Sequence, residues 1–158
     1  MPTHHITYQS LPTPANLPAP DRDLLAAATA ALPNSYSPYS NFKVAAAARL
    51  ADGTVVTGWN TENAAYPMCV CAEPATLAAA ASRCPGMAVV AMAITVKAPG
   101  RVLDQPASPC GSCRQQLHEH ESRFRTKMKL ILRAEAGPVY VFDSAGDILP
   151  FGFSGELL

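Results

Sequence analysis

The chain carries little charge, and neither sign is in excess. Asp, Glu, Lys and Arg make up 15% of its 158 residues, and twelve basic side chains balance twelve acidic ones. Proteins that bind duplex DNA or tRNA usually carry a basic excess, because neutralising phosphates supplies most of their affinity. The balance argues against a nucleic-acid partner and favours a small, roughly neutral ligand.

Long apolar runs are also missing. The longest apolar stretches, such as residues 88–96, are too short to cross a bilayer, which takes about 20 residues in a helix. The N-terminus lacks a basic region followed by an apolar run, so we expect no signal peptide and no membrane partner. We therefore expect a cytoplasmic protein with reduced cysteines.

The composition is otherwise that of a globular protein, because 49% of the residues are apolar. Five prolines among the first twenty residues exclude a helix and a central strand there. We expect residues 1–20 to form an extended, proline-rich arm and residues 21–158 to form one domain.

Hydrophobic periodicity and turn signals predict helices over residues 21–32, 71–83 and 111–123, and strands over residues 42–50, 54–59, 88–96, 128–133 and 139–142. Strands joined through helices should be parallel. The last two strands are joined by roughly five residues, too few for a parallel crossover, so we expect them to be antiparallel. The expected fold is α/β, with a five-stranded mixed sheet covered by helices.

Cysteines gather at the starts of two predicted helices. Cys71 begins one helix, and Cys110 and Cys113 begin another. Three thiolates suit Zn²⁺ and leave its fourth tetrahedral position open to water, as a catalytic site requires. The alternative is a closed site with Cys69 or Cys84 as fourth ligand. We disfavour it, because Cys69 should point away from Cys71 in an extended segment and Cys84 lies at the far end of its helix.

Glu73 follows Cys71 by two residues, in the first turn of the same predicted helix. A carboxylate there can take a proton from zinc-bound water, whose pKa the metal lowers to about 7, and deliver it to the substrate. Cys-x-Glu followed by Pro-Cys-x-x-Cys matches the signature of zinc deaminases, in which the Glu is not a ligand. The pattern predicts a zinc-dependent hydrolytic deaminase with Glu73 as proton shuttle.

Five segments together resemble a known family. They are Tyr36-Ser-Pro-Tyr-Ser-Asn-Phe-Lys-Val44, Asn60-Thr-Glu-Asn-Ala-Ala-Tyr-Pro67, Cys71-Ala-Glu73, Pro109-Cys-Gly-Ser-Cys-Arg-Gln115 and Leu149-Pro-Phe-Gly-Phe153. In this order they resemble the motifs of the small, homotetrameric cytidine deaminases that act on free nucleosides. The resemblance runs from about Asp21 to the end of the chain. It implies a three-layer α/β/α sandwich, one Zn²⁺ per subunit, and deamination of cytidine and deoxycytidine to uridine and deoxyuridine in pyrimidine salvage.

The resemblance also implies substrate contacts. Phe42 would stack near the pyrimidine, and Asn60 and Glu62 would hydrogen-bond the ribose hydroxyls. The backbone of Ala72, together with Glu73, would read the cytosine edge. Without the resemblance, Phe42 is equally well a core aromatic, and Asn60 and Glu62 are ordinary polar loop residues.

Two more residues acquire roles only through the implied tetramer. Phe153 would reach into a neighbouring subunit's active site, and Tyr66 would also be supplied across an interface. The expected partners are therefore a small nucleoside substrate and other copies of this chain.

Four positions depart from the family pattern. Pro74 stands where an Arg usually follows the catalytic Glu and hydrogen-bonds the cysteine ligands. Cys69 replaces a common Gly and adds bulk beside the site, Ala45 replaces another Gly, and Trp59 occupies a normally small position. The changes around the catalytic Glu keep open the deamination of another amino-heterocycle, such as blasticidin S or a modified pyrimidine. A zinc-stabilised scaffold that binds nucleosides without turnover is the alternative from a different class.

The remaining cysteine and the late histidines carry no chemistry in this interpretation. We expect Cys84 to be a small buried or half-buried side chain. We expect His118 and His120 to be surface residues late in a helix, where a cation interacts favourably with the helix dipole.

Overall fold

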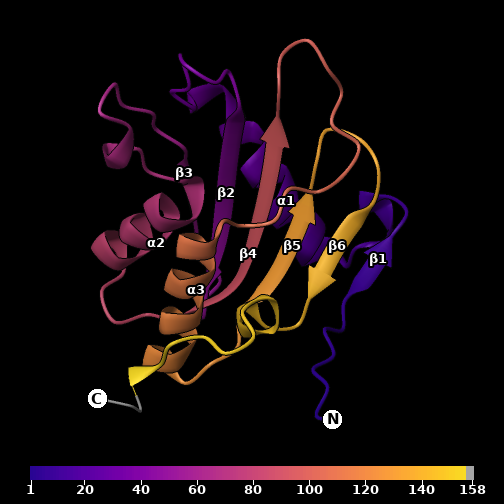
Figure 1. Cartoon of the computed structure of the whole chain (residues 1–158), viewed down its shortest axis with the longest axis vertical. Coiled ribbons are helices and arrows are strands. Elements are labelled where there is room, and N and C mark those ends of the chain that lie inside the picture. Colours follow the sequence, from indigo (N-terminus) through magenta and orange to yellow (C-terminus); the bar gives the residue numbers. More distant parts are fainter. Residues whose placement is uncertain (156–158) are drawn as a thin grey trace.

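A computed structural model, describing residues 1–155, contains a mixed sheet with helices on both faces (Figure 1). The strands are β1 (Gln9–Leu11), β2 (Lys43–Leu50), β3 (Val55–Trp59), β4 (Val89–Lys97), β5 (Lys129–Arg133) and β6 (Val139–Phe142); the α-helices are α1 (Ala19–Ala31), α2 (Ala72–Arg83) and α3 (Gly111–Phe124). Each helix and strand predicted from the sequence is present, with its ends within two residues of the prediction.

The strand order in the sheet is β1-β6-β5-β4-β2-β3. β4 and β5 are parallel, whereas β5 and β6 are antiparallel, which confirms the prediction for the last pair. The predicted number of strands is wrong, because the sheet has six. β1, within the proline-rich segment, pairs with β6 at the edge of the sheet. An edge strand tolerates a following proline such as Pro12, and three residues are too few to show an alternating pattern.

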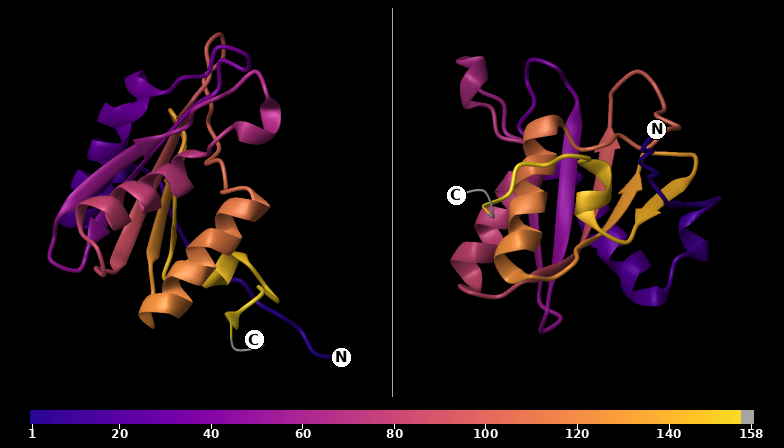
Figure 2. Two further views of the ribbon diagram at one scale, coloured as in Figure 1. Left: turned by 90° about the vertical axis from the view of Figure 1, so that its left-hand side faces the viewer. Right: turned by 60° about the horizontal axis from the view of Figure 1, so that its bottom comes forward.

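The layers agree with the expected α/β/α sandwich. α1 lies on one face of the sheet, and α2 and α3 lie on the other (Figure 2). On the α1 face, Leu24, Leu25 and Ala28 pack against small and branched side chains of the strands, such as Ala93 and Ile131. The core on the opposite face is larger and joins α2, α3 and the strands. β4 is buried on both faces, as its continuous apolar run predicts.

Two contacts fix the helices on the sheet. Gly58 of β3 allows α2 to approach closely, because a Cβ at this position would lie 2.6 Å from the backbone nitrogen of Thr76. On the other face, buried Asp21 of α1 accepts hydrogen bonds at 2.9 Å from Arg49 of β2 and from Lys129 of β5. Within residues 1–155, no helix is both long and apolar enough to cross a membrane.

Candidate metal centre and active site

Cys71 and Cys110 occupy the same structural position in two different helices. Each is the extended N-cap residue that immediately precedes the first turn, of α2 and α3 respectively. Gly111 follows Cys110, and Cys113 lies in the first turn of α3, where its backbone N–H donates to the Cys110 sulfur at 3.4 Å. Because helix N-termini carry free N–H groups and a partial positive charge, they stabilise thiolates.

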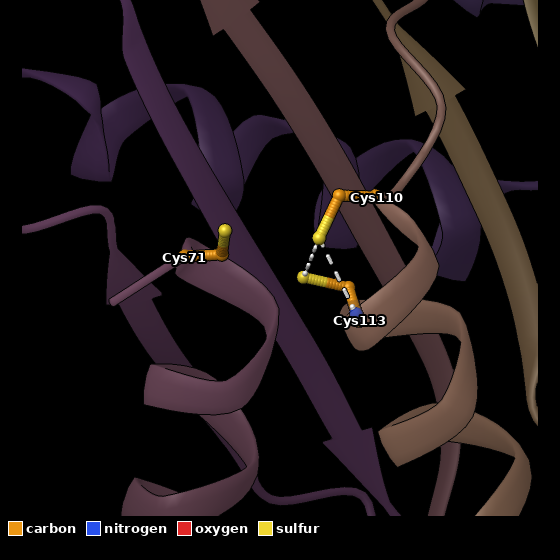
Figure 3. A group of neighbouring side chains, drawn as sticks. All are labelled: Cys71, Cys110 and Cys113. Atoms are coloured by element: carbon orange, nitrogen blue, oxygen red, sulfur yellow. Dashed lines mark hydrogen bonds between the residues drawn. The ribbon is translucent and has the colours of Figure 1, made fainter. Parts of the chain in front are cut away.

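The three cysteine side chains lie close together at the starts of α2 and α3, and the sulfurs of Cys110 and Cys113 are directed toward each other (Figure 3). All three lie within 4.8 Å of one another, and the sulfurs of Cys110 and Cys113 are 3.3 Å apart. Tetrahedral Zn²⁺ with Zn–S bonds of about 2.3 Å would set neighbouring sulfurs about 3.8 Å apart. The donor set therefore fits zinc with only small adjustments. Cys69 is not part of this cluster, so the arrangement agrees with a site of three cysteines.

The coupled protonation of Cys71 and Cys113 also fits a cation. A hydrogen bond with Cys113 lowers the pKa of Cys71 to about 7, and the same interaction with Cys71 raises the pKa of Cys113. Ionisation of one thiol therefore disfavours ionisation of its neighbour, because like charges this close repel each other. Three thiolates together need a multivalent cation between them.

Glu73 lies beside the cysteines in the wall of a cavity of about 410 Å³. Its side chain is almost fully buried, at 4% relative exposure, although α2 presents it in its first turn. Burial raises the pKa of this carboxyl group, because the charged form loses its hydration. A raised pKa makes the carboxylate a stronger base, as a group that takes up and passes on a proton requires.

The cavity wall is partly apolar and partly polar. Besides Glu73, Cys71 and Cys110, it is formed by Ser40, Phe42, Val44, Asn60, Thr61, Glu62, Cys69, Val70, Ile94, Val96, Ala107 and Ser108. The structure thus brings together the predicted residues Phe42, Asn60 and Glu62 with the cysteines and Glu73. Ala72 is fully buried next to them in α2.

Asn60 and Glu62 hold the cavity wall together as well as lining it. Asn60 accepts a hydrogen bond from the backbone of Val44 and donates one to the carbonyl of Phe42, each at 2.9 Å. Glu62 accepts from the backbone N–H of Tyr39 at 2.8 Å and from both the backbone and the hydroxyl of Ser40. The Ser40 hydroxyl bond is the main reason that the pKa of Glu62 lies below its usual value. These contacts have no signal in the sequence, since they join segments that are about twenty residues apart.

Tyr66 and Phe153 lie outside this cavity. Tyr66 is 70% exposed and lines a smaller neighbouring crevice with Tyr39 and Cys69, and Phe153 is 56% exposed. The backbone of Phe153 exchanges hydrogen bonds with the side chain of Gln115 in α3. Within one subunit, neither aromatic ring belongs to the wall around Glu73.

The sequence model of the family "Cytidine and deoxycytidylate deaminase zinc-binding region" matches residues 18–126, which include all three cysteines and Glu73. The chain belongs to this deaminase family. A cytidine deaminase from Sporosarcina psychrophila is 35% identical over 142 residues, covering 84% of this chain and 90% of the relative. The cytidine deaminase of Mycobacterium tuberculosis is 47% identical over 93 residues, but the match spans only 65% of that relative.

Solved structures of the same deaminase family share the fold. The crystal structure of cytidine deaminase from Burkholderia pseudomallei superposes with a TM-score of 0.71 at 40% sequence identity. The superposition covers 83% of this chain and 97% of the other.

The departures from the deaminase motif fall into two groups. Cys69 and Pro74 lie near the metal centre: Cys69 lines the cavity, and Pro74 sits in the first turn of α2. A proline at this position costs no helical hydrogen bond, because the backbone N–H groups of the first turn have no acceptor within the helix. Ala45 and Trp59 instead face each other across β2 and β3 and pack under α1, so they lie on the sheet face away from the cavity.

Arg114 was not among the predicted site residues. It follows Cys113 in α3, and its guanidinium donates to the carbonyl of Pro109 at 2.8 Å and to that of Ile148 at 3.2 Å. It therefore holds the residue before Cys110 against the C-terminal segment. Its place in the Pro-Cys-Gly-Ser-Cys-Arg motif is the signal from which this role could have been inferred.

Proposed function

We propose that this protein catalyses the zinc-dependent hydrolytic deamination of cytidine and deoxycytidine to uridine and deoxyuridine, with release of ammonia. The observation that carries the proposal is the meeting of three cysteine sulfurs beside a nucleoside-sized cavity, whose wall includes two of these cysteines and the buried carboxyl group of Glu73. The names of the relatives, all of them cytidine deaminases, support the same substrate.

Cys71, Cys110 and Cys113 would hold the zinc ion. When bound, zinc acts as a Lewis acid that makes a water molecule nucleophilic at neutral pH. Glu73 would take one proton from the attacking water and deliver it to the ring nitrogen next to the reacting carbon, where it stays. It would then take the second proton of the same water and deliver it to the leaving amine. In the net reaction water supplies the new carbonyl oxygen, the carbon–nitrogen bond breaks, and ammonia leaves.

The remaining wall would orient the nucleoside. Phe42 offers an aromatic face to the pyrimidine, and the backbone of Ala72 at the start of α2 can hydrogen-bond its polar edge. Asn60 retains one amide N–H, and Glu62 retains acceptor capacity, after the bonds described above. Both could therefore hydrogen-bond ribose hydroxyls and keep the hydrogen bonds that they already make within the protein.

The division into a proline-rich arm at residues 1–20 and a domain at residues 21–158, of which residues 156–158 lie outside the described part, remains our proposal. We also propose a cytoplasmic homotetramer with shared active sites and no nucleic-acid partner. The exposure of Tyr66 and Phe153, both large and aromatic, supports a role across an interface.

The direct test follows the ultraviolet absorbance change as cytidine becomes uridine, with zinc-loaded protein. We expect Glu73→Gln to lower kcat by about 10²–10⁴-fold, because the isosteric amide cannot carry the proton. Glu119→Gln removes an exposed carboxylate from α3 and is the matched control, with unchanged activity.

Two outcomes would contradict the proposal. If zinc-loaded wild type releases no ammonia from cytidine but does so from another amino-heterocycle, the substrate is wrong. If no heterocycle is deaminated while zinc and nucleoside both bind, the protein is a scaffold and not an enzyme.

A further inference from the structure

A second cavity lies on the opposite face of the sheet from the candidate active site. It has a volume of about 900 Å³ and lies between α1 and the ends of β4 and β5. We call it the α1 groove, and α1 lines it with one stripe of residues spaced three or four apart: Arg22, Leu25, Ala26, Thr29 and Ala30. Its volume lies within the range of about 300–1,000 Å³ that is typical of small-molecule sites.

The floor of the α1 groove is apolar. Apart from the α1 stripe, it is formed mainly by Leu32, Pro33, Val96, Pro99 and Ala134. Thr29 directs its hydroxyl to the carbonyl of Leu25 in its own helix, at 2.9 Å, so it offers the groove no free donor. An apolar molecule or chain would fit this floor.

The rim, in contrast, is cationic. Lys43, Lys97 and Arg133 come from the ends of three adjacent strands and lie on the α1 face by the alternation of the strands. Lys43 and Lys97 are direct cross-strand partners. Like charges in this position destabilise a sheet unless something neutralises them. Among the described residues, the one ion pair here joins Lys97 to Glu135, at 3.2 Å.

The other end of the same face shows how the fold neutralises such a cluster. There Arg49 of β2 and Lys129 of β5 flank one strand, and the buried carboxylate of Asp21 binds both at 2.9 Å. At the α1 groove, Lys43 and Arg133 come from the same two strands, but two residues apart along β4: Lys43 pairs with Lys97, and Arg133 pairs with Thr95. Within residues 1–155 they have no carboxylate partner. The C-terminus of α1 adds only about half a negative charge.

The structure assigns to the α1 groove a binding site for a small amphipathic carboxylate of the fatty-acid class. Its head group would lie at the cationic rim, near Lys43 and Arg133, which have no carboxylate partner within residues 1–155. Its apolar chain would lie along the α1 stripe. The site opens on the other face of the sheet from the substrate cavity, because Phe42 and Val44, the neighbours of Lys43, face the opposite side; Val96 lies in the wall between the two.

Calorimetric titration of the full-length, zinc-loaded protein tests this site with three probes: octanoate, octanol as the chain without the charge, and acetate as the head group alone. We expect one octanoate per chain, bound at least about tenfold more tightly than octanol or acetate. Arg133→Gln and Lys43→Gln should each weaken octanoate binding about tenfold. Lys127→Gln, which removes an exposed lysine on another part of the surface, should leave it unchanged.

A further variant tests whether octanoate binding needs the groove itself as well as the charges at its rim. Ala30→Phe places a ring in the groove and keeps the cations, so it should abolish octanoate binding while thermal unfolding shows a folded protein. Equal binding of octanol and octanoate, or no effect of Arg133→Gln, would overturn the proposal. So would octanoate binding that occurs only with a change in subunit number by light scattering, since a second copy of the chain would then be the natural occupant. None of these readouts depends on deaminase activity.

Discussion

Gly137 offers a sharp test of how the metal centre is positioned, although it lies far from the cysteines in the sequence. It belongs to the turn between β5 and β6 and has a φ of +77°, a region that disfavours residues with a side chain. A Cβ there would lie 1.9 Å from the carbonyl oxygen of Asp104. Asp104 is part of the loop of residues 98–110, which ends at Cys110.

The turn and the loop are joined by further bonds. The backbone of Ala136 donates to Leu103 at 2.9 Å, and the Tyr140 hydroxyl donates to Gln105 at 3.0 Å. In Gly137→Ala the loop must retreat by about 1 Å to restore a tolerable contact. A displacement of that size at a catalytic group lowers rates by about 10²-fold. We therefore expect kcat to fall by about that factor.

Gly100→Ala is the matched control. Gly100 lies in the same loop at a φ of +80°, but no atom lies within 4 Å of its Cβ position. Both variants should lose about 1–2 kcal/mol of stability from the backbone conformation, so the difference between them isolates the contact with Asp104. The visible spectrum of the Co²⁺-substituted protein reports the geometry at Cys110 without turnover. Equal kcat values and equal Co²⁺ spectra for the two variants would refute the reasoning.

Two predictions concern stability. Asp21→Asn should lower the free energy of unfolding in urea by about 2–3 kcal/mol, because Arg49 and Lys129 lose their shared partner but remain partly hydrated; a loss near zero would show that the ion pairs are dispensable. His120 accepts a hydrogen bond from the backbone of Val89 at 2.9 Å, and burial holds its pKa below 6.5. The unfolded chain therefore binds the proton more readily, so stability should fall as the pH drops below about 6.5, and His120→Gln should remove this part of the pH dependence in thermal unfolding.

Much of the fold could be predicted from patterns that reflect burial. The apolar run of β4, the Asp52-Gly53 turn between β2 and β3, and the stripe of Leu24, Leu25 and Ala28 in α1 all predict elements that the structure contains. β1 could not be predicted, because its pairing with β6 depends on where the rest of the chain folds. His120 was expected at the surface and is half-buried, since its helix turns this side toward the start of β4.

The candidate site divides in the same way. The cysteines and Glu73 could be identified because metal ligands at two helix starts have a fixed local spacing. The hydrogen bonds of Asn60 with β2 and of Glu62 with Ser40 could not be identified from the sequence, because each joins segments that meet only in the folded chain. The sequence indicated what these side chains could bind, and the structure adds what they already hold in place.

The placement of Cys71 and Cys110 on separate helices has a consequence for folding. A metal ion bound by both closes a loop of roughly forty residues, which contains all of α2 and β4. By the chain-entropy relation, such a closure removes about 4 kcal/mol of conformational freedom from the unfolded chain. Zinc would then act as a reversible cross-link comparable to a disulfide, and one that forms under the reducing conditions where disulfides do not. Zinc supply would therefore govern how long the folded chain survives as well as whether it is active.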